Sequence, residues 1–310
     1  MIGKTQPKTT HTFQKDTEHT ELKSILYVII AGCCWGIIGL FSRPLLTIGY
    51  SAIQVSLLRA LFTSLFLIIY TFAKDRSKFH VLFKDLWLFV GTGILSIAAF
   101  NVCYFISISL NSLSLAAILL YTAPSFVVIL SRMIFKEKIT RSKLMALVLS
   151  FAGSFFAAGL IGSSVQTSLL GLLVGLGSGL GYALYSIFSK IALKKYNWLT
   201  VITYTFIFAT ISLLPLSPPS EIKGLFISMP SYLITILALS LISTLLPFFL
   251  YTSALQTLEA GKASLFTFVE PLVATQVGVF LFGEDLTINI VIGISLIVVS
   301  LFITKTSTQA

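Results

Sequence analysis

One carboxylate stands inside an apolar run near the C-terminal end of the chain. Glu270 and Pro271 interrupt the segment "KASLFTFVEPLVATQVGVFLFG", which ends at Gly283. A carboxylate at the centre of a bilayer costs roughly 2.5–3.5 kcal/mol, so it should face other helices or water. There it could bind a substrate ammonium group or carry a proton. The alternative is structural: Pro271 frees the backbone carbonyl of Thr267, which Glu270 could satisfy.

A cation lies inside a second apolar run. Arg59, in "LLRALFTSLFL", is expected roughly 9 Å below the membrane surface at about 1.5 Å per residue. It could bind a substrate carboxylate, take part in gating, or extend outward to the interface. Other residues in apolar runs could line a cavity with Glu270 and Arg59, and they are Trp35, Asn101, Tyr104, Tyr121, Tyr182, Tyr251 and Gln276. For each of these the alternative is packing or interfacial anchoring.

The composition is that of a membrane protein. Of the 310 residues 56% are hydrophobic and 10% are charged, against about 25% charged residues in soluble domains. The formal net charge of +10 could suggest nucleic acid. However, the basic residues form short clusters between apolar runs without a basic face, which is typical of membrane topology signals. We therefore expect a lipid bilayer and no nucleic acid among the partners.

Apolar segments follow one another almost without a break after residue 24. Each has the roughly 17–25 residues that a helix needs to cross a bilayer. The expected spans are 25–41, 53–73, 86–108, 113–135, 144–162, 169–191, 199–216, 232–256, 263–282 and 287–304. The fold class is therefore all-α, with ten transmembrane helices.

The Lys and Arg residues predict the orientation. With the N-terminus in the cytoplasm, 18 of the 21 basic residues fall on the inner side. The exceptions are Arg43 and Lys223 on the outer side and Arg59 within a span. The positive-inside rule thus places both termini in the cytoplasm.

The chain repeats itself at an offset of 147 residues. "GCCWGIIGLFSR" (32–43) aligns with "GLGYALYSIFSK" (179–190), so Trp35 matches Tyr182 and Arg43 matches Lys190. At the same offset Tyr104 matches Tyr251, Pro124 matches Pro271, and "FKEKIT" (135–140) matches "FGEDLT" (282–287). Below, two residues related by this offset are called repeat mates.

An odd number of helices in each half makes the two repeats inverted, which is an architecture of secondary transporters with a midplane site between the repeats. We expect a disordered tail at 1–24, one five-helix repeat at 25–162, a second at 169–304, and a short tail at 305–310. Glu270 has Ala123 as its mate, so the recurring proline does not require the carboxylate. Asn101 likewise has an apolar mate, Phe248.

These features resemble the EamA-like branch of the drug/metabolite transporter superfamily. The resemblance rests on the 5+5 duplication, on "CCWGIIGLFSR" and "LLRALFTSLFL", and on "FVEPLVATQVGVFLFGED" (268–285). It implies transport of amino acids, other metabolites or toxic compounds, with export as the main direction. Uptake or facilitated exchange by the same fold, or a membrane enzyme or scaffold without a transport path, remain the alternatives.

Motifs for other chemistry are missing. The sequence contains no GxxxxGK[ST] loop, HExxH or GxSxG, and its three histidines lie in the tail or in a loop. We expect no enzyme and no cofactor. The prediction is a transporter of the bacterial inner membrane, monomeric or homodimeric, with a small-molecule substrate and protons as a candidate coupling ion.

Two further features have structural interpretations. The glycines of "GLLVGLGSGLGYALYS" (171–186) recur at four-residue spacing, which favours close helix packing. Glu137 and Glu284 are repeat mates near helix ends, among basic residues in the case of Glu137. We expect surface pairing there and assign neither to the transport path.

Overall fold

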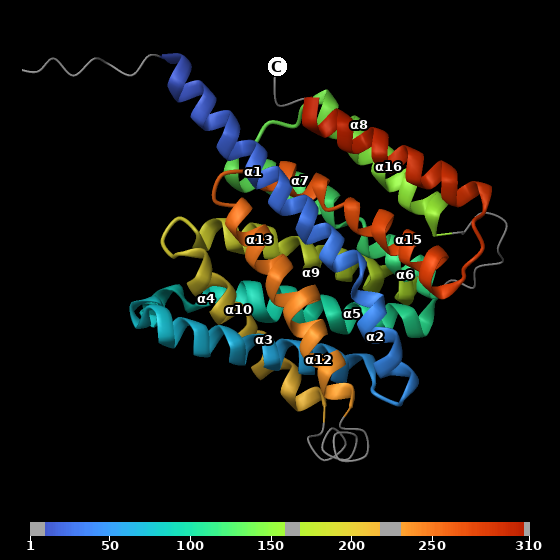
Figure 1. Cartoon of the computed structure of the whole chain (residues 1–310), viewed down its shortest axis with the longest axis horizontal. Coiled ribbons are helices and arrows are strands. Elements are labelled where there is room, and N and C mark those ends of the chain that lie inside the picture. Colours follow the sequence, from blue (N-terminus) through green and yellow to red (C-terminus); the bar gives the residue numbers. More distant parts are fainter. Residues whose placement is uncertain (1–9, 159–167, 218–230, 307–310) are drawn as a thin grey trace, which may run out of the picture.

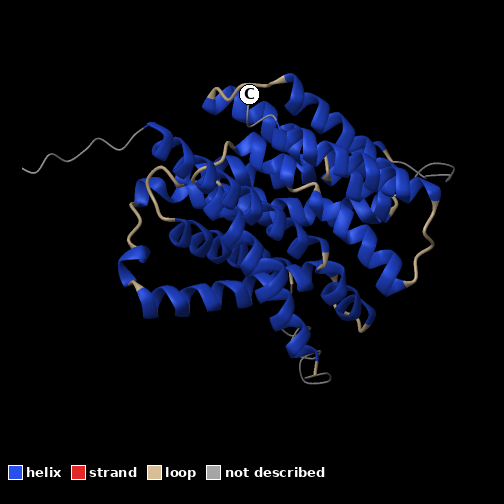
Figure 2. Ribbon diagram, turned by 45° about the horizontal axis from the view of Figure 1, so that its top comes forward, coloured by secondary structure: helices blue, strands red, loops and turns tan. Residues whose placement is uncertain are grey.

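The structure is a computed structural model that describes residues 10–158, 168–217 and 231–306. Within these ranges the regular elements are all helical, as Figure 2 shows. Lys223 lies outside the described residues. Most of the boundary between the predicted repeats, near residues 162–168, also lies outside them. The first helix begins at Thr10 and so extends into the stretch that we expected to be disordered.

The long helices of the two halves follow one another in the same order, although some spans are divided differently. Those of the first half are α1 (Thr10–Gly36), α2 (Ile38–Thr47), α3 (Ala52–Lys74), η1 (Arg76–Phe79), η2 (Phe83–Asp85), α4 (Leu86–Phe89), η3 (Val90–Ala98), α5 (Ala99–Leu110), α6 (Leu113–Leu120), α7 (Ala123–Phe135) and α8 (Arg141–Ala157). Those of the second half are α9 (Leu169–Ala192), α10 (Trp198–Leu213), η4 (Leu214–Leu216), α12 (Tyr232–Ser240), η5 (Leu241–Leu245), α13 (Leu246–Ala254), α14 (Ala260–Phe266), α15 (Val269–Phe282) and α16 (Ile288–Thr306).

Local irregularities recur with the repeat. The break between α6 and α7 comes just before Pro124, and the break between α14 and α15 comes just before its mate Pro271. A π-helical segment interrupts the third span of each half: η3 lies between α4 and α5, and η5 lies between α12 and α13. α7 and α15 end in left-handed residues that are mates, Lys136 with φ of 59° and Gly283 with φ of 69°. The duplication therefore extends to individual backbone conformations.

Nine helical segments among the described residues are long and apolar enough to cross a membrane. The expected span at 144–162 falls on α8, which has 17 residues and ends before residues that lie outside the described ranges. α8 packs along α16, its counterpart in the second half. The all-helical membrane fold is confirmed, whereas the count of ten remains a prediction.

The helices stack in layers (Figure 1). α8 and α16 form a pair on one side, α3, α10 and α12 lie on the other, and α1, α9, α13 and α15 run between them. The largest group of buried apolar side chains includes Val28 of α1, Ile187 of α9 and Leu250 of α13 in this middle layer, and it extends to α3 and α10. The N-terminal part of α1 and the C-terminal end of α16 lie on one face of the bundle, where Thr20 and Thr304 line a common surface cavity. We call this face of the bundle the termini face, and we call the other end of the bundle the opposite face.

Glycines in α9 allow close helix contacts at particular positions. A Cβ atom on Gly179 would lie 2.4 Å from Thr122 Oγ1 and 2.8 Å from the carbonyl of Leu119, whereas one on Gly177 would have only Cys103 Sγ within 4 Å, at 3.7 Å. The close-packing interpretation therefore holds for Gly179 and not for Gly177.

We expect Gly179→Ala to destabilise the protein by about 1–3 kcal/mol, because the added methyl group cannot fit without moving backbone. Gly177→Ala, two residues away on the same helix, is the matched control and should leave stability unchanged or slightly raised. Thermal unfolding in detergent micelles measures both. Equal melting temperatures for the two variants would contradict the proposed contact.

Candidate functional site

A cavity of about 350 Å³ lies between the two repeats. Its volume is within the usual range for small-molecule sites. We call it the large cavity, in contrast to its small symmetry counterpart described below. It extends to the opposite face, because its lining includes Leu46 at the end of α2, Ala52 at the start of α3, Leu113 at the start of α6 and Phe282 at the end of α15. The cavity is thus open at one end of the bundle.

Seven of the nine predicted site residues line this cavity. They are Trp35 on α1, Arg59 on α3, Asn101 and Tyr104 on α5, Tyr121 at the α6–α7 break, Tyr182 on α9 and Glu270 on α15. These elements come from both repeats. The inverted duplication is what brings residues more than 200 positions apart to one cavity.

Glu270 faces the cavity rather than the disturbed backbone next to it. Its Oε2 accepts a hydrogen bond from the Tyr182 hydroxyl at 3.3 Å. The Thr267 carbonyl, which Pro271 deprives of its usual donor, accepts instead from the backbone N–H of Glu270 at 2.8 Å. The side chain of Glu270 is therefore not used to satisfy the kink.

Close helix contact fixes the place of Glu270. A Cβ atom on Gly36 of α1 would lie 2.8 Å from the Glu270 carbonyl and 2.7 Å from Val273 Cβ. Because only glycine allows this approach, α1 packs directly against the first turn of α15. The neighbouring residue Trp35 thereby enters the same cavity as Glu270.

Arg59 also faces the cavity. Its Nη2 donates to Asn101 Oδ1 at 3.3 Å, and the Ser56 hydroxyl donates to the same oxygen at 2.8 Å. Asn101 is fixed in turn by a hydrogen bond from its Nδ2 to the carbonyl of Ile97 in η3, at 2.6 Å. Sequence reasoning missed Ser56, although its position three residues before Arg59 puts it on the same helix face.

Arg59 and Glu270 line one cavity without neutralising each other. Among the described residues, no ion pair joins the two side chains. The cavity therefore presents a cation and a carboxyl group at separate points of its wall. Such an arrangement suits a ligand that carries both charges.

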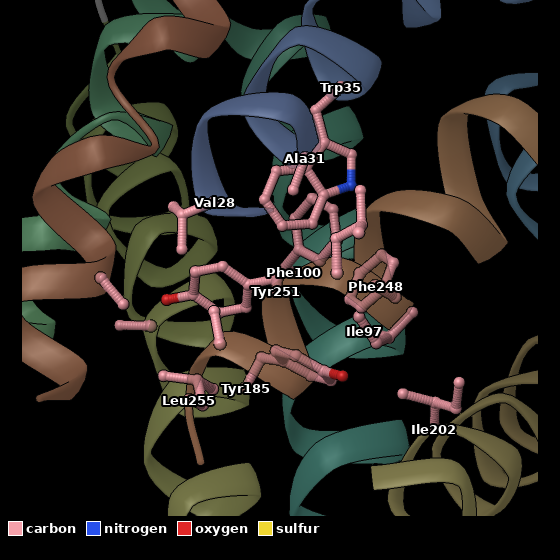
Figure 3. Packing of buried hydrophobic residues seen from close by; sticks show 14 of the residues in the cluster. Val28, Ala31, Trp35, Ile97, Phe100, Tyr185, Ile202, Phe248, Tyr251 and Leu255 are labelled. Carbon is pink, nitrogen blue, oxygen red and sulfur yellow. The ribbon is translucent and has the colours of Figure 1, made fainter. Parts of the chain in front are cut away.

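Aromatic rings lie at the inner end of the cavity, where Trp35, Phe100 and Phe248 are part of its lining. Figure 3 shows these three packed together with Tyr185 and Tyr251. The Trp35 ring lies 5.3 Å from Phe248 and 5.6 Å from Tyr251, centroid to centroid. Tyr251 donates to or accepts from Ser186 at 2.7 Å and does not line the large cavity. The rings separate that cavity from the termini face.

Gln276 lies away from the cavity. It is an exposed residue on α15, whereas Glu270, Ala274, Val277 and Gly278 of the same helix line the cavity. At about 100° per residue, position 276 points away from the face that includes 270, 274 and 277. The amide in this apolar run was a misleading signal, because the span alone does not indicate which face is inward.

A second cavity of only about 10 Å³ lies on the other side of the aromatic rings. It is large enough for about one water molecule. Its lining includes Ala123, Val127, Ser264 and Thr267, whose repeat mates Glu270, Ala274, Ala117 and Leu120 line the large cavity. Pro124 is the single lining residue whose mate does not. The small cavity is therefore the symmetry counterpart of the large one, in a closed form.

We expect Asn101→Leu to lower both stability and substrate binding. The change removes the acceptor of Arg59 and Ser56, and a hydrogen bond to a charged group contributes about 1.5–3 kcal/mol. Asn101→Asp, which keeps an oxygen at that position, is the control. Thermal unfolding in detergent checks the effect, and an unchanged melting temperature for Asn101→Leu would show that the hydrogen bonds do not matter.

Comparison with known proteins gives the same family for both halves. The sequence model of the EamA-like transporter family matches residues 22–159 and again residues 169–306. An uncharacterized transporter of Archaeoglobus fulgidus is 28% identical over 82% of this chain and 88% of its own length. A second uncharacterized transporter of that organism is 30% identical over 68% of this chain and 75% of its own length.

Two further proteins extend the similarity to nearly the whole chain. The uncharacterized inner membrane transporter YicL of Salmonella typhimurium is 25% identical over 91% of this chain and 94% of its own length. One solved crystal structure has a TM-score of 0.77 at 15% identity, covering 92% of this chain and 97% of the other. At that identity the structural similarity shows the fold.

Proposed function

Because this chain belongs to the EamA-like transporter family, we propose that it is a secondary transporter that exports amino acids or related amphipathic metabolites. Its coarser identity as a multi-pass membrane transporter follows from the family and from relatives that are named transporters. Those names also support a non-enzymatic role. The substrate class, the direction and the mechanism are our proposals.

The observation that carries the substrate class is the pair of charges in the large cavity. A free amino acid has a carboxylate for Arg59 and an ammonium group for Glu270. Arg is well suited to a carboxylate because its planar guanidinium can form two parallel hydrogen bonds. The apolar and aromatic wall, with Trp35, Phe100 and Tyr104, would accommodate the side chain of the substrate.

Alternating access is supported by the two unequal cavities. One is open at the opposite face and its symmetry counterpart is closed at the termini face. Exchange of these two states would expose the site to each side of the membrane in turn. The distribution of Lys and Arg favours a cytoplasmic termini face, and the name of YicL favours the inner membrane.

Flux in proteoliposomes tests the proposal. Purified protein is reconstituted, and efflux of a panel of labelled amino acids is measured with and without a pH gradient, against protein-free liposomes. We expect saturable efflux of some amino acids, faster with an inward proton gradient. If transport is equal with and without the gradient, the protein acts by facilitated exchange. Lack of flux for every amino acid would contradict the substrate class.

A further inference from the structure

Glu137 ties two helices together at the termini face. It follows the end of α7, and its Oε1 and Oε2 accept from the backbone N–H groups of Ala260 and Gly261 at 2.8 and 3.0 Å. These are the first residues of α14, whose own N-cap residue Glu259 makes no side-chain capping bond. Glu137 supplies the missing acceptor from another part of the chain.

Lys190 holds the same loop from its other side. Its Nζ donates to the carbonyls of Leu255 at 2.7 Å and Leu258 at 2.5 Å, in the turn between α13 and α14. One carboxylate thus binds N–H groups and one ammonium group binds carbonyls within a single short connection. We call Glu137, Lys190 and the backbone groups that they bind the termini-face lock.

The repeat mates of these two residues are Glu284 and Arg43, at the opposite face. By symmetry they would bind the connection between α5 and α6: Glu284 the N–H groups of residues 113 and 114, and Arg43 the carbonyls of residues 108 and 111. They do not. Arg43 Nη2 and Glu284 Oε1 pair with each other at 2.7 Å, and the guanidinium lies over the Phe282 ring at 4.0 Å.

The difference lies in the side chains and their partners, since the local backbone is the same at both ends. The backbone N–H of Glu137 donates to the Ser131 carbonyl at 3.3 Å. The backbone N–H of Glu284 donates at 3.1 Å to the carbonyl of Gly278, which is the repeat mate of Ser131. Each glutamate follows a left-handed residue. The two ends therefore carry equivalent pairs of charged residues that bind different partners.

The partners of each charged pair correlate with whether the cavity beside that pair is open or closed. The small, closed cavity lies on the termini-face side, where Glu137 and Lys190 bind the α13–α14 connection. The large cavity lies on the opposite side and is lined by Arg43, Ile108 and Leu113. The cavity is open at the end where the carboxylate and the cation do not bind the connection.

We propose that Glu137 with Lys190, and Glu284 with Arg43, are two gate locks that close in alternation. When the opposite face closes, Glu284 accepts from the amides of Leu113 and Ser114, and Arg43 donates to the carbonyls of Ile108 and Asn111. The termini-face lock then opens, and Glu137 and Lys190 pair with each other. This inference rests on the proposed transport by alternating access. The expected surface pairing is found for Glu284 with Arg43, whereas Glu137 binds backbone amides instead.

Cysteine labelling in nanodiscs tests the locks without any substrate. Cys33, Cys34 and Cys103 are replaced by Ala or Ser, and reporters are placed at a pair of mates, Ala117→Cys in the large cavity and Ser264→Cys in the small one. A membrane-impermeant thiol reagent is added, and the labelling rates are compared.

In the otherwise unchanged protein we expect fast labelling of the reporter at 117 and slow labelling at 264. Glu137→Gln should raise the rate at 264 by about tenfold or more and lower the rate at 117, since each lost charge-assisted bond favours the other state. The matched control is Glu259→Gln, which removes a carboxylate from the same connection that pairs instead with Lys143.

A double variant tests the alternation. Adding Glu284→Gln to Glu137→Gln removes the second lock as well. The labelling rate at position 264 should therefore fall back toward the rate in the reporter protein with both glutamates unchanged. Asp285→Asn in the same background should not have this effect. Equal rates at 264 for Glu137→Gln and Glu259→Gln, or no change on adding Glu284→Gln, would overturn the proposal.

These outcomes are distinguishable from failure of the proposed function. Labelling requires no transported compound, so lack of amino-acid flux would contradict the proposed substrate and leave the labelling pattern as it is. Conversely, normal flux with unchanged labelling in all variants would remove the locks and leave transport standing. Size-exclusion elution of each variant shows whether it has folded.

Discussion

Replacing Glu270 by Gln is expected to lower amino-acid transport at least about thirtyfold and to abolish its response to a pH gradient. Glu270 is the carboxyl group on the wall of the large cavity, held by Tyr182. Loss of one partner of a desolvated charge pair removes about 2 kcal/mol or more of binding. Initial rates in proteoliposomes, with and without the gradient, measure both effects.

The control for this variant is Glu259→Gln, which removes a carboxylate outside the large cavity. It should transport at the normal rate and retain the response to the gradient. A second control is chemical: Glu270→Gln should no longer distinguish an amino acid from the acid that lacks its amino group. If Glu270→Gln transports as the unchanged protein does, the role of Glu270 is wrong.

Replacing Arg59 by Gln is expected to have a comparable effect on the other end of the substrate. The guanidinium is held by Asn101 and faces the cavity, where it would bind the substrate carboxylate. We expect KM for amino acids to rise about thirtyfold or more. Arg59→Lys should recover only part of this loss, because an ammonium group cannot form the two parallel hydrogen bonds.

Competition experiments separate this role from a structural one. The unchanged protein should be inhibited far better by an amino acid than by the amine formed from it by decarboxylation. In Arg59→Gln the two competitors should become nearly equal. A variant that folds, transports slowly and still prefers the amino acid would show that Arg59 does not bind the carboxylate.

The repeat was the most informative sequence feature. The fixed offset of 147 residues relates the kinks at Pro124 and Pro271, and the structure extends the correspondence to the left-handed ends of α7 and α15. Duplicated backbone could be predicted because it depends on local residue types such as proline and glycine. The inward position of Glu270 could be predicted because a charge is costly anywhere else in a membrane.

Side-chain partners between distant helices could not be predicted in the same way. Gln276 was expected in the site and is exposed, because one residue of helical rotation changes the face by about 100°. Glu137 was interpreted as a surface residue, whereas it binds amides 123 and 124 positions away. The repeat identified Glu137 and Glu284 as mates, but which of them binds depends on the state of the gate.

The most direct test of the account is protection of the cavity wall by substrate. An amino acid that the protein transports is added to the Ala117→Cys reporter in nanodiscs, and the rate of thiol labelling is measured in the otherwise unchanged protein, in Glu270→Gln and in Arg59→Gln. We predict concentration-dependent protection that is lost in both variants. Transport of that amino acid without any protection of position 117 would contradict the claim that the substrate binds in this cavity.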